Sequence, residues 1–170
     1  LSLPFCSLGN ESMGTLSKLK ALKSLNLMGN SKGFTDEGLE ALAGLEHLEF
    51  LNLEGNSLIK GPGLRHLVQL KHLRELDLGR ISRDSGIENS GFDHLGRMTA
   101  LKNLSLRHCE KFSPESLDKL TGLKNLEAID FSYAFTYRDD KKGIRPALAR
   151  LQKALPRCKM VVSKRFENEK

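Results

Sequence analysis

The 170-residue chain contains no tryptophan, two tyrosines and three cysteines. Three cysteines without a Cys-x-x-Cys pair exclude a disulfide framework and a paired-cysteine zinc site. No apolar run approaches the roughly 18 residues of a membrane-spanning helix, and the first ten residues lack the charged start and apolar stretch of an intact signal peptide. With 39% hydrophobic and 28% charged residues, the composition is that of one globular domain.

Leucine is the residue that the chain has in excess, with 32 copies against eight isoleucines and valines together. The core of a parallel sheet is ordinarily rich in β-branched residues. The excess therefore indicates a repeated unit that requires leucine.

Segments of the form L-x-x-L-x-L-x-x-N are this unit, and their second half alternates apolar and polar residues as a strand does. They start 26, 25, 28, 25 and 29 residues apart, and the first six residues fit the same frame from its fourth position. The segments are LKSLNLMGN (22–30), LEFLNLEGN (48–56), LRELDLGRI (73–81), LKNLSLRHC (101–109), LEAIDFSYA (126–134) and LPRCKMVVS (155–163).

Apolar residues at a spacing of three lie between these segments and predict helices of about two turns. Thr35 before Asp36 and Ser113 before Pro114 are predicted N-caps. The last helix, from 144 to 155, is predicted to be longer.

Alternating strands and helices predict an α/β fold, a stacked βα solenoid with a concave parallel β-sheet of about seven strands and short helices on the convex side. The predicted domain is 1–162, with a truncated first repeat and with 144–162 as a C-terminal cap. We predict a disordered tail over 163–170. We also expect upstream repeats or a further domain to cover Leu1, Leu3 and Leu16.

The stretch GFTDEGLEALAGLEHLEFLNLEGN (33–56) resembles leucine-rich repeats with helical convex sides, of the ribonuclease-inhibitor-like and bacterial T-D-x-G-L types. The resemblance covers nearly the whole chain. It implies a right-handed horseshoe that binds another protein and has no catalytic activity and no cofactor.

The resemblance also implies that the ninth position of each repeat bonds to the backbone of the adjacent turn. Ile81 and Ala134 cannot do so, and we therefore expect irregular loops over 78–92 and 131–144. Cys158 is predicted to replace a strand leucine. All three cysteines are expected to be structural, and their odd number favours a reducing compartment. The ninth-position residues are Cys6, Asn30, Asn56, Ile81, Cys109 and Ala134.

The outward-facing strand residues are the predicted binding surface. Phe50 and Met28 have no packing reason to lie on an exposed strand, so they are candidate anchors; a merely solvated strand surface is the alternative. The alignment of the repeats gives Lys159 the same position in the last repeat that Asp130 has in the one before, so the two are predicted to be neighbours on adjacent strands. The predicted partner-binding residues are Ser24, Asn26, Met28, Phe50, Asn52, Glu54, Glu75, Asp77, Asn103, Ser105, Arg107, Asp130 and Tyr133.

Four of the ten aromatic residues lie in the stretch 131–137. Tyr133, Phe135 and Tyr137 either fill the space left by the missing asparagine at position 134 or contact a partner.

Basic residues are concentrated at the C-terminal end, where 141–170 carry ten Lys or Arg and two acids. A polar cap of the array explains this composition. The alternative function is a scaffold that docks on an acidic protein, a membrane or nucleic acid, although no aromatic interleaving supports nucleic acid. The residues of this predicted basic patch are Lys141, Lys142, Arg145, Arg150 and Lys153.

A further alternative is the substrate-recognition part of a ubiquitin ligase adaptor, which resembles this repeat type and would depend on sequence outside this chain. Catalysis is disfavoured because the five histidines are scattered over different repeats and no pair has the spacing of a zinc helix. We predict no metal site and no enzymatic activity.

Overall fold

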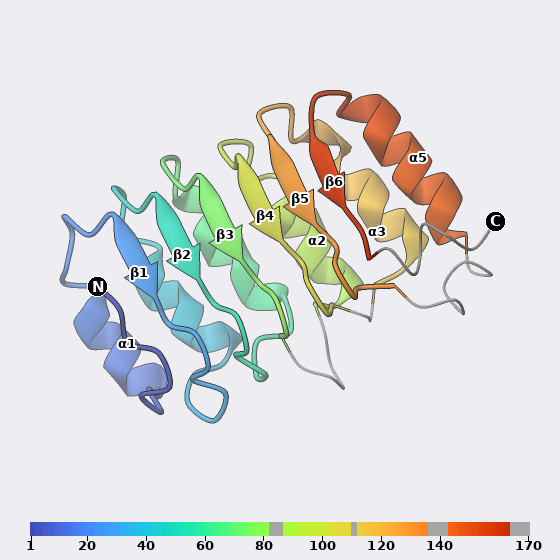
Figure 1. The fold of residues 1–170 in the computed structure, drawn as a ribbon. Helices are drawn as coiled ribbons and strands as arrows, with labels where there is room; N and C mark the ends of the chain where they lie inside the picture. Colours follow the sequence, from blue (N-terminus) through green and yellow to red (C-terminus); the bar gives the residue numbers. More distant parts are fainter. Residues whose placement is uncertain (82–86, 110–111, 136–142, 164–170) are drawn as a thin grey trace.

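The computed structural model describes the chain except for 82–86, 110–111, 136–142 and 164–170. Within these described residues, six three-residue strands form one parallel sheet in chain order. Figure 1 shows them side by side in one layer, with the helical segments in a second layer behind. The strands are β1 (Ser24–Asn26), β2 (Phe50–Asn52), β3 (Glu75–Asp77), β4 (Asn103–Ser105), β5 (Ala128–Asp130) and β6 (Lys159–Val161).

The central residue of each strand faces the core, and these residues are in register from strand to strand. Leu25 pairs with Leu51, and Leu51 pairs with Leu76; all three are buried. The residues on either side of each central residue therefore point out of the sheet. Because strands lie only about 4.8 Å apart and the helices behind them are wider, the sheet is the concave side, here called the strand face.

In the described residues the sheet has six strands and not the predicted seven or so, and the first half-repeat adds one isolated bridge. Ser2 bridges to Asn26, and the Leu3 amide donates to the Asn26 carbonyl at 2.8 Å. The first half-repeat therefore continues the sheet without forming a regular strand.

The helical segments cover the opposite face of the sheet, and several are 3₁₀ helices (η). Thr35 caps η1 as predicted, because its side chain accepts a hydrogen bond from the Glu37 amide at 3.3 Å. The segments are α1 (Asn10–Leu16), η1 (Asp36–Leu42), η2 (Pro62–Gln69), α2 (Asn89–Leu95), α3 (Pro114–Asp118), η3 (Lys119–Gly122) and α5 (Ile144–Ala154). No helix in the described part of the chain is long and apolar enough to cross a membrane.

The first residue of several helical segments accepts hydrogen bonds from the start of the helical segment in the next repeat. The Asn89 side-chain oxygen accepts from the Ser113 amide at 3.0 Å and from the Ser116 hydroxyl at 2.7 Å. Ser113 occupies the N-cap position of α3, but its side chain makes no capping bond. The predicted Ser113 cap is therefore wrong, and Asn89 of the preceding repeat holds the start of α3 instead.

The alignment of the last strand was wrong by two residues. Lys159 pairs with Ala128, and Val161 pairs with Asp130. The alignment had matched Leu155 to Leu126. Instead, Leu155 accepts the Cys158 amide at 3.1 Å, as Leu123 accepts the Leu126 amide at 2.9 Å. Leu155 thus closes the turn after α5, and buried Cys158 precedes the strand.

The ninth-position ladder forms where asparagine is present. The Asn30 amide donates to the carbonyls of Leu3 and Leu27 at 3.0 and 2.8 Å, and Asn56 donates to those of Leu27 and Leu53 at 3.0 and 2.7 Å. Each buried side chain therefore joins its own turn to that of the preceding repeat.

The other ladder positions divide into three kinds. Cys109 is buried, and its thiol contacts the Leu78 carbonyl at 3.2 Å. Cys6 is exposed, and its thiol contacts the nearby Pro4 carbonyl at 3.3 Å and not the Leu3 carbonyl that the ladder would require, so its predicted place in the ladder was wrong. Ile81 and Ala134 are buried in the core. Two loops, 78–92 and 131–144, were predicted to be irregular. Residues 82–86 of the first and 136–142 of the second lie outside the described residues.

Candidate binding surface on the strand face

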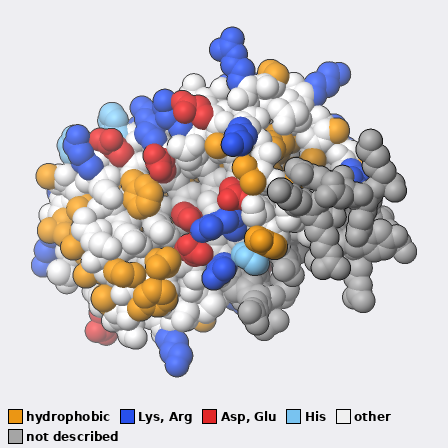
Figure 2. Space-filling view, viewed as in Figure 1, with side chains coloured by type: hydrophobic (Ala, Val, Ile, Leu, Met, Phe, Trp, Pro, Cys, Tyr) orange, Lys and Arg blue, Asp and Glu red, His pale blue; other side chains and the backbone are white. Residues whose placement is uncertain are grey.

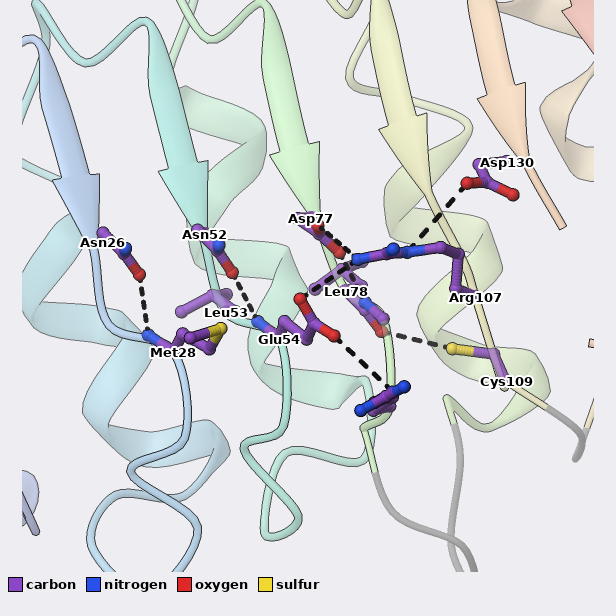
Figure 3. Close-up of polar contacts among 12 residues, drawn as sticks. Asn26, Met28, Asn52, Leu53, Glu54, Asp77, Leu78, Arg107, Cys109 and Asp130 are labelled. Carbon is purple, nitrogen blue, oxygen red and sulfur yellow. Dashed lines mark hydrogen bonds and ion pairs between the residues drawn. The ribbon is translucent and has the colours of Figure 1, made fainter. Parts of the chain in front are cut away.

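The last residue of most strands caps the turn that follows. Side-chain oxygens of four of these residues accept the amide hydrogen two positions on, at distances from 2.7 to 3.0 Å. Figure 3 shows two of these contacts, from Asn26 to the Met28 amide and from Asn52 to the Glu54 amide. The four residues are Asn26, Asn52, Asp77 and Asp130. These predicted partner-binding residues therefore stabilise the turn after their own strand. In Asp77 and Asp130 the second carboxylate oxygen remains for other contacts.

Ser105 is the exception among the last residues of β1 to β5. Its hydroxyl is buried and has no hydrogen-bond partner within the described structure. Serine is shorter than asparagine or aspartate, so the turn after β4 lacks the side-chain cap of its neighbours.

Arg107 lies at the centre of the strand face, among three carboxylates from three other repeats (Figure 3). Its Nη2 is 3.1 Å from Glu54 Oε2 and 3.5 Å from Asp77 Oδ2, and its Nε is 4.0 Å from Asp130 Oδ2. Arg80 Nε is 3.7 Å from the other Glu54 oxygen. Three of the acids predicted to contact a partner, Glu54, Asp77 and Asp130, are thus held by an arginine of the same face.

We predict that Arg107→Met lowers the free energy of unfolding by about 1 kcal/mol, because three carboxylates lose their shared cation. The arginine side chain is 38% exposed, so the surrounding water limits the effect. Urea denaturation at low salt measures it. Lys102→Met, which removes the exposed ion pair of Lys102 with Glu127, is the control, with an expected change below about 0.5 kcal/mol. An equal effect of the two substitutions would contradict a cooperative network.

A shallow hollow of about 190 Å³ lies beside this network on the strand face. It is smaller than the roughly 300–1,000 Å³ of small-molecule pockets, so its size suits a protruding side chain of another protein. Its lining combines apolar and acidic residues: Phe50, Glu75, Leu76, Asp77, Asn103, Leu104, Ser105, Ala128, Ile129, Asp130 and Val161.

The two predicted anchors differ in position. Phe50 lines the hollow, whereas Met28 lies beyond the end of β1; both are only partly exposed. Figure 2 shows red side chains on both sides of blue ones at the middle of this face and orange ones gathered toward β1. Glu75 and Ser24 are exposed, and Asn103 is half-buried.

The eighth position of the repeat has a backbone conformation that the sequence did not predict. Each residue has a positive φ, from 51° at Arg80 to 75° at Gly55. This left-handed conformation costs a non-glycine residue roughly 1–2 kcal/mol. The positions are Phe5, Gly29, Gly55, Arg80, His108 and Tyr133. The sequence signal for this conformation is the glycine at the eighth position of two repeats, Gly29 and Gly55, because glycine favours positive φ.

Three consecutive repeats place large side chains at these left-handed positions. Arg80, His108 and Tyr133 are here called the left-handed row. The rings of His108 and Tyr133 stack with centroids 4.8 Å apart and planes inclined by 10°. The side chain of Arg80 is 67% exposed, and Tyr133 is 62% exposed.

The aromatic stretch after β5 divides between core and surface. Phe135 is buried, with its ring centroid 5.4 Å from that of Phe131 and 5.6 Å from that of Phe112. It therefore fills the core next to Ala134, whereas Tyr133 remains at the surface. Tyr137 lies outside the described residues.

The basic C-terminal end is partly neutralised. Arg150 forms two hydrogen bonds with the carboxylate of Asp118, at 2.9 and 2.8 Å, and this contact holds the pKa of Asp118 below its usual value. Arg145 and Lys153 lie on α5, whereas Lys141 and Lys142 lie outside the described residues.

The described residues contain no group of three potential metal ligands. Burial raises the pKa of the Cys158 thiol, which disfavours the reactive thiolate.

Comparisons with known proteins agree with this architecture. A family model described as "Leucine Rich repeat" matches residues 19–43, from before β1 to the end of η1. An internalin (inlF) from Listeria monocytogenes is 25% identical, with a TM-score of 0.63 over 87% of this chain and 36% of that chain. An internalin C2 from the same organism is 21% identical, with a TM-score of 0.60 over 88% of this chain and 55% of that chain.

A chain of the yeast Rad7 and Elc1 complex is 18% identical, with a TM-score of 0.66 over 92% of this chain and 41% of that chain. The present chain thus spans between about one third and just over one half of these relatives.

Proposed function

We propose that this leucine-rich repeat protein is a recognition module that binds a partner protein on its strand face and has no catalytic activity of its own. The observation that carries the proposal is the hollow at the centre of this face. It combines an aromatic side chain, Phe50, with the exposed carboxylate of Glu75 and with ordered polar groups. Partly apolar patches with polar rims are typical of protein interfaces.

The similar structures support the proposal at the level of the fold. One of them is a complex of two proteins, Rad7 with Elc1. Stacked repeats form extended concave surfaces, and repeat proteins use such surfaces to bind other proteins.

A double substitution on the strand face tests the proposal. Phe50→Ala with Glu75→Lys removes the aromatic contact and reverses a charge that forms no ion pair within the described structure. We expect the affinity for the partner to fall about tenfold or more. Capture from native lysate identifies proteins lost with this variant, and titration calorimetry with the purified partner measures the change.

A matched control makes the same two kinds of change away from the strands. Leu58→Ala with Glu40→Lys truncates one exposed leucine and reverses one exposed charge on η1. The control should keep wild-type affinity at low and at physiological salt. Equal binding by wild type and both variants would move the interface off the strand face.

A further inference from the structure

We infer that the left-handed row is a contact surface that holds an acidic segment of the partner. The inference rests on the proposed function. It extends the binding surface to the row, at the edge of the strand face, and specifies the chemistry of the segment that binds there. It depends on the backbone, the exposure and the hydrogen-bonding groups of Arg80, His108 and Tyr133.

The backbone at this position is one that glycine adopts without strain. The first two full repeats place Gly29 and Gly55 there, with φ of 73° and 75°. The next three place an arginine, a histidine and a tyrosine in the same conformation, with φ between 51° and 60°. Bulky residues in this conformation are uncommon, and they concentrate at functional sites.

Packing in the core does not account for Arg80 or Tyr133, although the Tyr133 ring stacks on that of half-buried His108. Arg80 and Tyr133 are mostly exposed, and the backbone bond at this position forms with arginine as it does with glycine. The Arg80 amide donates to the Arg107 carbonyl at 2.7 Å, just as the Gly55 amide donates to the Gly79 carbonyl at 2.9 Å. The side chains are therefore available to a ligand without cost to the core.

The chemistry of the row favours an acidic segment. Its guanidinium, imidazole and phenol groups can all donate hydrogen bonds, and the row contains no carboxylate. The neighbouring Glu54 lies nearer to Arg107, at 3.1 Å, than to Arg80, at 3.7 Å. Arg80 is therefore only weakly paired. Arginine and tyrosine are also the residues most often responsible for binding energy at interfaces.

A titration of the full chain with short peptides tests the inference. The isotope-labelled protein is followed by amide NMR while a peptide rich in Glu and Asp is added, and then a peptide with Lys in place of every acid. We expect the acidic peptide to shift the amides of Arg80, His108 and Tyr133 in a saturable way. Shifts confined to α5, or equal shifts with the lysine peptide, would overturn the inference.

Glycine substitutions separate binding from structure. Arg80→Gly with Tyr133→Gly installs the residue that the first two full repeats use. We expect about a tenfold loss of acidic-peptide affinity, with a melting temperature within about 3 °C of wild type. Ser7→Gly is the control, because Ser7 is exposed with a φ of 53° but lies outside the row. It should leave binding unchanged.

A second pair, Arg80→Asn with Tyr133→Asn, uses a residue that also tolerates positive φ and should show the same loss of binding. Unchanged peptide affinity in either pair, or a large fall in melting temperature in both, would assign the row a structural role instead. The proposed function is tested separately. If Phe50→Ala with Glu75→Lys still weakens the partner protein while the row variants do not, only the inference about the row fails.

Discussion

Replacing Asn30 by alanine is expected to lower the free energy of unfolding by about 2–4 kcal/mol, because two partly buried backbone groups, at Leu3 and Leu8, lose their partner. Its side-chain oxygen accepts the Leu8 amide at 3.1 Å, and its amide donates to two carbonyls, of Leu3 and Leu27. The Leu27 carbonyl keeps its bond from Asn56. The Leu3 and Leu8 groups account for most of the loss. Urea denaturation followed by circular dichroism measures it.

Asn125→Ala is the matched control for this substitution. Asn125 is exposed and donates one hydrogen bond, to the Thr99 carbonyl at 2.9 Å. The expected change is below about 0.5 kcal/mol. Equal destabilisation by the two substitutions would show that burial of the ladder asparagine contributes nothing.

Asp36→Ala is expected to cost about 2–3 kcal/mol, because one carboxylate receives three backbone amides of the next repeat. Its Oδ1 accepts from the Gly61 and Gly63 amides at 3.1 and 2.7 Å, and its Oδ2 accepts from the Lys60 amide at 2.8 Å. These bonds hold the start of η2 against η1. The loss should appear as a lower denaturation midpoint with unchanged strand-face binding at temperatures where the variant is folded.

Asp36→Asn removes one acceptor of the cap together with its charge and keeps the other acceptor. The amide of asparagine can accept on one side only, so the Lys60 amide loses its partner while the Gly61 and Gly63 amides keep theirs. We expect about half of the effect of alanine. If Asn and Ala were equally destabilising, the Lys60 bond would account for the whole contribution.

The repeat spacing was sufficient to predict the sheet, since each leucine-rich segment forms a short strand and the strands follow chain order. The ladder was predictable for Asn30 and Asn56 because an amide has both a donor and an acceptor. It failed for Cys6 because its thiol contacts the carbonyl of Pro4, two residues back, and not that of Leu3, which Asn30 bonds. The register of β6 failed because Leu155 matches the pattern but belongs to a turn.

The candidate site was predicted less completely than the fold. Alternation along each strand indicates which side chains face outward, but not what those side chains do there. Asn26 and Asn52 were predicted as contact residues, and both cap the turn after their strand. That role depends on where the backbone turns, which the repeat pattern does not specify.

The sequence by itself determined the repeat, the chain-order parallel sheet and the residues that fill the core, because burial at a fixed period leaves one arrangement of the leucines. The tertiary structure decided which charges meet and which backbones are strained. Arg107 reaches carboxylates from three other repeats only because curvature and side-chain length bring them together. The left-handed row exists because every repeat leaves its strand through the same turn, whichever residue is present.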